Sequence, residues 1–406
     1  MIQIEEAVKG NKFNSAVVAT MSFLFLTDLL FLSVFGKRYS ETLIFHPIYV
    51  HDFLLSIIFL LSFFLKIKGN RILSIEILIG LSLFYLGYSL MFNLDFESVS
   101  ELLILLRQFM VFGYLILLYP IIRTFNTYYS INQIAKAILI IGLVGVTLQF
   151  FYSGFLSISH QTLPFFKKFY FTPVCFFAII ITASYILVHI GGIKKYLFFS
   201  LSILLSFTAG HDSLYLSLIL MYAAYLFLKF NRKQKVLVVF GILAFCLILF
   251  LTIPQFSNWT SQWRLYYWQS TLKEIVFNNY LIFGKGFGVP YISEINANEI
   301  YNMTLANGVK YRFDRWVTPA HNSFLTLCYH VGVMAIILLF VPLKNIHKIL
   351  KKESHFFILL CLIGFSFYSS FNVILELPHL TTIYWLVYFT LVFQLKLSIS
   401  KERISE

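Results

Sequence analysis

The sequence predicts an all-α protein, a polytopic bundle of about twelve transmembrane helices with one large extracytoplasmic loop. Three observations lead to this fold class: a very apolar composition, recurring windows of membrane-spanning length, and basic residues that gather in alternate connections. Of the 406 residues, 59% are hydrophobic and 12% are charged, and the mean hydropathy is +0.81. A soluble domain carries about 25% charged residues, so lipid must supply part of the solvent of this chain.

The spans are expected where about 20 apolar residues match a hydrocarbon core about 30 Å thick. They are residues 15–35, 49–65, 72–92, 102–122, 136–153, 170–190, 196–209, 214–230, 236–253, 321–343, 355–373 and 381–395. The seventh window is short for a full crossing.

Lysine and arginine in the connections predict the orientation, because basic residues concentrate in cytoplasmic loops. With the N-terminus inside, the inner segments hold 20 basic residues and the short outer loops hold 4, namely Lys37, Arg38, Lys167 and Lys168. We therefore expect a multi-pass membrane protein with both termini cytoplasmic.

One connection is far longer than the others. Residues 254–320 separate spans one to nine, in 1–253, from spans ten to twelve and a cytoplasmic tail, in 321–406. Long loops inside a compact protein are usually functional. The stretch from Trp263 to Phe277 can form an amphipathic helix at the membrane interface, with Trp263, Tyr267 and Trp268 as anchors.

The net charge of +13 follows from scattered loop lysines and arginines. Nucleic-acid binding would need a basic face on one folded module, so no nucleic-acid partner is expected. The four cysteines show no metal-ligand spacing and are interpreted as small hydrophobic residues. No cofactor and no metal site are expected.

The segment from Trp316 to Leu325 opens the tenth predicted span on its outer side. Thr318 is expected to cap a helix that begins at Pro319, which places His321 and Asn322 in the first turn. The positive end of that helix would favour a neutral imidazole at His321, which suits a base, and would attract anions at the same point. The alternative is an interfacial histidine that only bonds the backbone.

Arginines in the long loop are candidates for binding phosphate. Arg264 begins the stretch that ends at Trp268, and its guanidinium either lies against lipid headgroups or grips a pyrophosphate in fork geometry. Arg312 and Arg315 bracket Asp314, which we expect to neutralise one of them. Gly284 to Gly288 is interpreted as a tight turn, because no strand precedes it.

Ionisable residues inside spans are functional candidates, because a charge at that depth is costly. Asp28 lies near the middle of the first span and Arg107 lies inside the outer end of the fourth, so they either pair with each other or serve a pathway. His211 with Asp212, and Glu376 with His379, lie in short outer turns that could face the same cavity as His321.

Taken together, these features resemble the O-antigen ligase and O-antigen polymerase superfamily of bacterial envelope-glycan enzymes. The pattern is an Arg-x-x-x-Trp stretch (Arg264 to Trp268), the glycine-rich turn, and His321-Asn322 followed by Gly332, in order within a late outer loop. The resemblance covers roughly residues 200–345, and the first half only by topology. Members usually carry a Ser-Arg pair after the seventh or eighth span, whereas this chain has Thr208 to Ser213 there, including His211.

The resemblance implies transfer of a glycan from undecaprenyl pyrophosphate to an acceptor hydroxyl on the outer leaflet, without nucleotide or metal. Arg264 would stabilise the leaving group and His321 would accept the proton, with Asn322 in substrate binding. The role of the missing arginine would fall to His211, Arg107, Arg312 or Arg315. Partners would be the lipid-linked oligosaccharide, the acceptor glycan, membrane lipid and a chain-length regulator.

Within the superfamily, a repeat-unit polymerase is favoured over a ligase, which stays open. A transporter or flippase for lipid-linked glycans is the alternative from another class, and a scaffold without activity is the third. A transporter should show two related halves and broken helices near mid-membrane. No such halves are visible in the sequence.

Overall fold

The computed structural model describes residues 12–40, 42–45, 48–65, 71–93, 99–159, 173–208, 212–230, 259–306, 314–316, 318–349 and 353–405. Within these ranges the chain is helical apart from connections and one short antiparallel pair, β1 (Leu43–Phe45) with β2 (Ile48–Tyr49). The all-α fold class is confirmed for this part of the chain.

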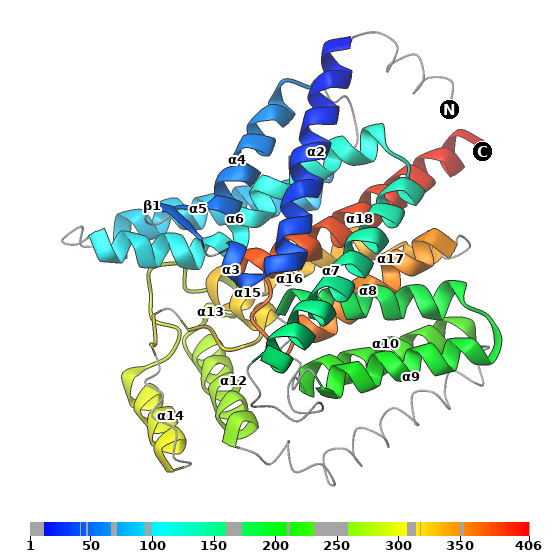
Figure 1. Ribbon diagram of the computed structural model, residues 1–406. Helices are drawn as coiled ribbons and strands as arrows, with labels where there is room; N and C mark the ends of the chain where they lie inside the picture. The colour runs from blue at the N-terminus through cyan, green and yellow to red at the C-terminus, as the bar shows by residue number, and fades with distance from the viewer. Residues whose placement is uncertain are drawn as a thin grey trace.

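Helices cover the predicted spans except for 236–253, which lies outside the described residues (Figure 1). In the first half they are α2 (Lys12–Phe35), α3 (Lys37–Ser40), α4 (Val50–Phe63), α5 (Leu73–Phe92), α6 (Val99–Tyr128), α7 (Ile131–Ser159) and α8 (Pro173–His189). In the second half they are α9 (Gly192–Thr208), α10 (Asp212–Lys229), α12 (Trp259–Phe277), α13 (Tyr280–Phe283), α14 (Glu294–Ala306), α15 (Ser323–Val331), α16 (Val333–Phe340), the 3₁₀ turns η2 (Val341–Leu343) and η3 (Ile346–Ile349), α17 (Glu353–Ser369) and α18 (Pro378–Ser405).

Four described helical segments are long and apolar enough to cross a membrane: Phe13–Phe35, Leu73–Phe92, Glu101–Tyr128 and Leu380–Ile399. The pair α15 and α16 passes the same test together and would make a fifth, but it is bent by 118° at Gly332. Other apolar helices are shorter, as in Val50–Phe63 and His355–Ser369. The chain is therefore an all-α membrane protein with at least four membrane-length helices among its described residues.

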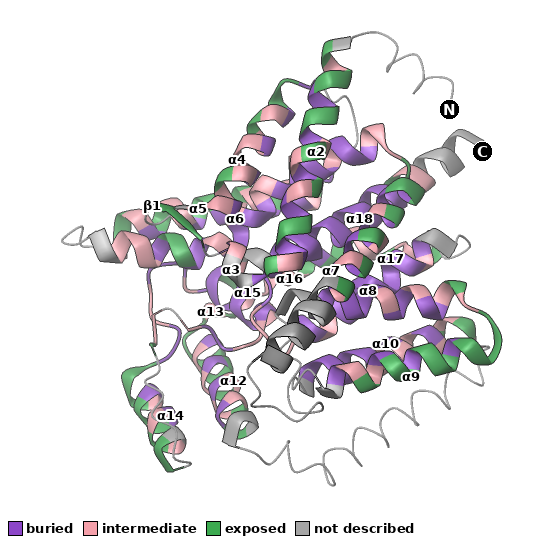
Figure 2. Ribbon diagram, viewed as in Figure 1, coloured by how far each residue is buried: buried purple, intermediate pink, exposed green. Residues whose placement is uncertain are grey.

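Helix α18 forms the centre of the bundle and packs along α6 and α17 (Figure 2). Its side chains from Leu380 to Leu395 are buried almost without a break, and Trp385 and Phe389 are among the largest fully buried ones. A helix that is apolar all round has no face for water, so its neighbours must enclose it.

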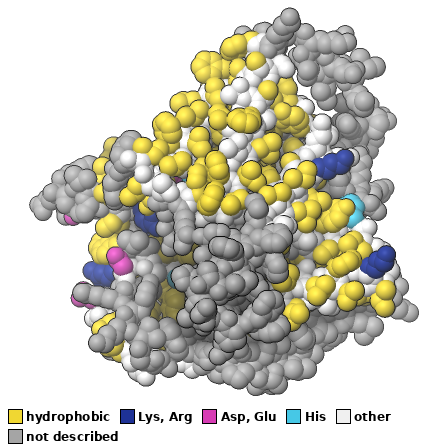
Figure 3. Space-filling view, viewed as in Figure 1, with side chains coloured by type: hydrophobic (Ala, Val, Ile, Leu, Met, Phe, Trp, Pro, Cys, Tyr) yellow, Lys and Arg dark blue, Asp and Glu magenta, His cyan; other side chains and the backbone are white. Residues whose placement is uncertain are grey.

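The outer helices expose large apolar side chains instead of polar ones. Phe23 on α2 is 69% exposed and Met91 on α5 is 76% exposed, and hydrophobic side chains cover the face over α2 and α4 in Figure 3. Contiguous apolar surface on this scale marks contact with an apolar environment. These faces are suited to lipid.

The predicted alternative that Asp28 pairs with Arg107 is wrong. Asp28 is fully buried, and its Oδ1 accepts hydrogen bonds from the Tyr39 hydroxyl at 2.8 Å and from His51 Nδ1 at 3.0 Å. His51 Nε2 lies 3.0 Å from the hydroxyl of Thr382, so this polar group joins α2, α4 and α18. Arg107 is exposed on α6.

Candidate active site

The described helices between α10 and α15, namely α12, α13 and α14, form a small helical unit against the start of α15. α12 packs against α14 and α15, and α13 packs against both halves of the bent pair. In Figure 1, α12 and α14 lie together at the lower left, below α13 and α15. The shared apolar cluster consists of Trp263, Tyr267, Ile275, Tyr291, Ile292, Ala297, Ile300, Ala320, Leu325 and Tyr329.

The predicted helix from Trp263 to Phe277 exists within α12, but its aromatic residues are not membrane anchors. Tyr267 is fully buried and Trp263 is 9% exposed, so both pack inside the protein. The exposed apolar positions of α12 are others, including Leu272 and Phe277. An aromatic position on an amphipathic helix suits a protein core and a headgroup layer equally well.

Two side chains of α12 hold the backbone that leads into α15. The Tyr267 hydroxyl donates to the carbonyl of Thr318 at 2.7 Å, and Trp268 Nε1 donates to the carbonyl of Ala320 at 2.5 Å. These bonds fix residues 318–320 against α12. His321 follows directly, so α12 determines where this histidine sits.

His321 adopts a left-handed backbone conformation, with φ of 51°. Its N–H donates to the carbonyl of Pro319 at 2.8 Å, and its ring meets Trp263 edge to face at a centroid distance of 5.0 Å. Few non-glycine residues hold a positive φ, and such residues gather at functional sites. The strain is maintained here by the clamp from α12.

The helix cap differs from the prediction. The N-cap of α15 is Asn322, whose side-chain oxygen accepts a bond from Leu325 N at 3.0 Å, and the helix begins at Ser323. His321 therefore lies outside the helix and not in its first turn, and Thr318 does not cap. Asn322 is better suited to capping than Thr318 because its side chain reaches the N–H three residues on.

His321 is held neutral by its surroundings. Burial and the nearby charge of Arg264 lower the pKa of His321 to about 4, against a small opposing effect of the Pro319 carbonyl. The helix end was expected to do this, but burial is the main cause and Arg264 the second. The Arg264 guanidinium carbon lies 5.7 Å from the centre of the Trp263 ring, so the Trp263 ring lies beside both Arg264 and His321.

Three segments meet at Ser323, the first residue of α15. Its hydroxyl donates to Glu376 Oε2 at 2.5 Å and accepts from the backbone N of Ile374 at 2.8 Å. In the same turn between α17 and α18, Asn372 Nδ2 donates to Ser213 Oγ at 2.7 Å, which ties in the start of α10.

Of the outer turns predicted to face the same cavity as His321, the turn with Glu376 is bonded to Ser323, two residues after His321, and burial raises the pKa of Glu376. His211 lies outside the described residues, although Ser213, two positions later, is at this junction. The side chain of His379 is likewise not described.

The glycine-rich stretch is a tight turn, as predicted, and it fits against the bend between α15 and α16. Lys285 N donates to the carbonyl of Tyr329 at 2.7 Å, and Gly286 N donates to that of His330 at 3.0 Å. A Cβ on Gly284 would lie 2.4 Å from the His330 oxygen, and one on Gly332 would lie 2.0 Å from the Ile282 oxygen. Both glycines have positive φ, of 64° and 82°. Only glycine fits such backbone contact.

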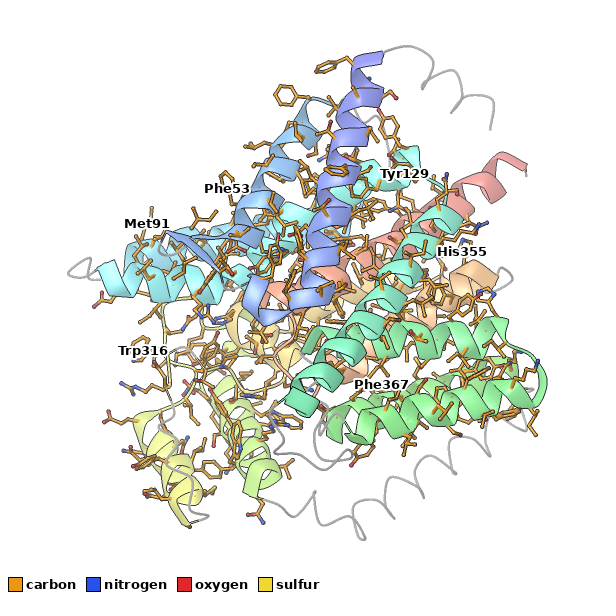
Figure 4. The ribbon with its side chains drawn as sticks, in the orientation of Figure 1. Phe53, Met91, Tyr129, Trp316, His355 and Phe367 are labelled. Carbon is orange, nitrogen blue, oxygen red and sulfur yellow. The ribbon has the colours of Figure 1, made fainter. Side chains whose placement is uncertain are left out.

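Gln108 was not a candidate in the sequence analysis, yet it ties the membrane bundle to this unit. Its Nε2 donates to the carbonyls of Val289 at 2.8 Å and Trp316 at 2.9 Å, and its Oε1 accepts from Gly288 N at 2.8 Å. Figure 4 labels Trp316 in the connection above α14. The neighbouring Arg107 lies close enough to act electrostatically on Tyr291 of the same unit.

The remaining predicted residues are placed in part. Arg315 lies 3.9 Å from Glu294 and its guanidinium lies over the Trp316 ring at 5.6 Å, so its acidic partner is Glu294 and not Asp314. Asp314 Oδ1 accepts from Trp316 N at 2.9 Å. Arg312 lies outside the described residues.

Residues 196–340 match a family model described as O-antigen ligase. This match covers less than half of the chain and supports the resemblance to the O-antigen ligase and polymerase superfamily. No curated protein matches the chain. The matched region runs from α9 to α16 and contains α12, the glycine turn and His321. The matched family is one of glycan assembly, which is consistent with the apolar helices of a membrane protein.

Proposed function

We propose that this O-antigen ligase-type protein is a glycosyltransferase that moves a glycan from undecaprenyl pyrophosphate to an acceptor sugar hydroxyl on the outer leaflet. Within that class we propose a polysaccharide repeat-unit polymerase. The observation that carries the proposal is that a neutral, strained His321 and the cation Arg264 both lie beside the Trp263 ring, with Arg264 close enough to lower the pKa of His321. A neutral imidazole beside a guanidinium provides a proton acceptor and an anion-binding group in one site.

The transfer requires two charge movements. The acceptor oxygen attacks the anomeric carbon while the bond from that carbon to the pyrophosphate oxygen breaks, and its electron pair leaves with the pyrophosphate. Arg264 stabilises this charge with its fork of N–H donors. The proton of the acceptor hydroxyl passes to His321. In-line attack of this kind inverts the anomeric centre and needs no metal.

Substrate binding improves His321 as a base. A pKa of about 4 makes the empty-site imidazole a weak proton acceptor. A pyrophosphate bound to Arg264 brings negative charge close to the ring and offsets the guanidinium, which raises the pKa of His321. Proton acceptance is thereby favoured when the donor is in place. Arg107, Arg312, Arg315, His211 and Asn322 are the proposed substrate-binding residues.

The proposed membrane arrangement has twelve spans, with both termini on the cytoplasmic side of a bacterial inner membrane. Residues 1–253 would hold nine spans, 254–320 the extracytoplasmic unit, and 321–406 the last three spans. The distribution of 20 inner against 4 short-loop outer basic residues supports this orientation. A chain-length regulator is a proposed partner of the polymerase.

A ligase of the same superfamily and a transporter of lipid-linked glycan are the competing functions. The test is glycan profiling of a deletion strain complemented with wild type, Arg264→Ala, His321→Ala or the matched control Lys273→Ala, an exposed charge on the same helix as Arg264. A polymerase gives long polymer with wild type and the control, and single repeat units with both site variants. If the strains with the site variants make long polymer that stays on its lipid carrier, the protein is a ligase. If single units in those strains never reach the outer leaflet, it is a transporter.

A further inference from the structure

A cavity of about 240 Å³ lies away from the candidate active site, between α2 and α7. Side chains of α2, α6 and α7 line it, and Leu386 of α18 contributes to its wall. An apolar cavity of about 150 Å³ is already large enough to bind benzene in a protein interior. This space can therefore hold part of a hydrocarbon chain.

The polar lining residues are all at one end of the cavity. Ser22 is the first lining residue of α2, Gln133 is the first of α7, and Tyr129 follows the end of α6. The Ser22 and Tyr129 hydroxyls are hydrogen-bonded at 2.9 Å. Figure 4 labels Tyr129 at the upper end of the molecule, where α6 turns into α7.

Beyond that end the lining is apolar for several helical turns. Phe25 and Leu29 follow Ser22 on α2, and Ala137 and Ile141 follow Gln133 on α7. Leu29 follows Ser22 by seven positions, which corresponds to about 10 Å along a helix. A molecule with a polar head and a linear apolar tail matches this arrangement.

The cavity opens toward the lipid-facing surface of the bundle. Leu26 lines it and is 43% exposed, and Ile140, on the adjoining face of α7, is 59% exposed. Hydrocarbon chains are the solvent at such surfaces, so they are the apolar groups able to enter.

We propose that this cavity is a binding site for one acyl chain of a membrane phospholipid, with the headgroup at the Ser22–Tyr129 end. The site is separate from the proposed transfer chemistry, because neither His321 nor Arg264 lines the cavity. The bound chain fills a space between α2, α7 and α18 that the side chains leave empty.

The test is native mass spectrometry of the purified full-length protein with added phosphatidylethanolamine. Ala137→Phe fills the cavity, whereas Ile140→Phe adds the same ring three residues away on the lipid-facing surface. The retained phospholipid should be lost in Ala137→Phe and kept in wild type and Ile140→Phe. Retention of the same lipid by folded Ala137→Phe, or its absence from wild type, would overturn the proposal.

A second measurement does not depend on a variant that folds. A phospholipid with a diazirine near the middle of its acyl chain should label peptides containing Leu26, Leu29 or Ile134 in the wild-type protein. The reference is α9, whose Leu201 and Leu204 are 45% and 58% exposed and lie inside the predicted span 196–209. Saturable enrichment over α9 supports a site, and equal labelling of both surfaces shows that lipid contact is non-specific.

Discussion

Replacing Arg264 with glutamine should raise the pKa of His321, and this change tests the electrostatic core of the candidate site. The pKa of His321 is lowered from 6.5 to about 4 by burial first and by Arg264 second. Glutamine keeps a similar side-chain length and removes the charge. The pKa should therefore rise but stay below 6.5, because the desolvation of the ring remains.

The same shift predicts a dependence of stability on pH. Below pH 6.5 the unfolded chain protonates this imidazole, while the folded protein does so only near pH 4. The folded protein is therefore most stable, as far as His321 is concerned, above pH 6.5, and this part of its stability is lost as the pH falls through about 4. The interval between the two values corresponds to about 3 kcal/mol for this largely buried group. Arg264→Gln should reduce that dependence.

The assay is NMR titration of ring-labelled histidine in protein reconstituted in nanodiscs. The chain has 10 histidines, so the His321 signal is assigned as the one that His321→Gln removes. Lys273→Gln, which removes an exposed charge on the same helix, should leave the titration unchanged. If wild-type His321 titrates at 6.5 or above, or if Arg264→Gln does not move it, the electrostatic argument is wrong.

Three further predictions concern the framework around the site, each measured by thermal unfolding in detergent. Gly332→Ala should lower the free energy of unfolding by more than about 1 kcal/mol, because φ is 82° and a Cβ would lie 2.0 Å from a backbone oxygen of α13. The control Gly80→Ala, in open space on α5, should not have this effect. Equal effects of the two substitutions would contradict the argument. Gln108→Ala should lower the free energy of unfolding by about 2–3 kcal/mol, because backbone groups of the outer unit lose their hydrogen-bond partner. An unchanged melting temperature would show that Gln108 of α6 does not hold the outer unit. Asp28→Ala should lower the free energy of unfolding by about 3–5 kcal/mol, and Asp28→Asn should lower it less, because the amide oxygen still accepts a hydrogen bond from His51. Equal losses of stability in the two variants would refute a hydrogen-bonding role for Asp28.

The helices could be predicted from the sequence because each depends on a local property. A run of about 20 apolar residues is helical in lipid whatever surrounds it, since its backbone must satisfy its own hydrogen bonds. Arg264 and His321 are predicted as site residues from their residue types, which suit phosphate binding and proton transfer, and from the short motifs that carry the family resemblance. Neither inference needed a long-range contact.

The bend at Gly332 could not be predicted in this way. The residues from Ser323 to Phe340 read as one apolar window, and a single glycine within it is tolerated in a helix. The cause of the bend is a contact with α13, some 50 positions earlier, whose backbone occupies the space that a Cβ would need. The partner of Asp28 was missed for the same reason, because His51 is one of several polar residues that could reach it.

The aromatic residues of α12 show how one pattern can support two environments. Trp263, Tyr267 and Trp268 suit a headgroup layer, yet they form the wall and clamp of the candidate site. A lipid anchor needs only the aromatic ring at the correct depth, whereas the clamp needs Thr318 and Ala320 carbonyls within reach. Those carbonyls are about 50 residues away, so only the fold reveals the second arrangement.

The position of His321 ties catalysis to this clamp. A histidine in the first turn of α15 would take its orientation from the helix alone, whereas His321 precedes the cap and takes it from α12. Arg264 belongs to the same helix, so one element places the proposed base and the proposed anion-binding group together. Because the coupling between two sites is reciprocal, a pyrophosphate that raises the pKa of His321 must itself bind more tightly once His321 is protonated. In the proposed transfer, once the acceptor proton has moved to His321, the leaving pyrophosphate would therefore be held by two cations, Arg264 and the imidazolium, when its charge is greatest.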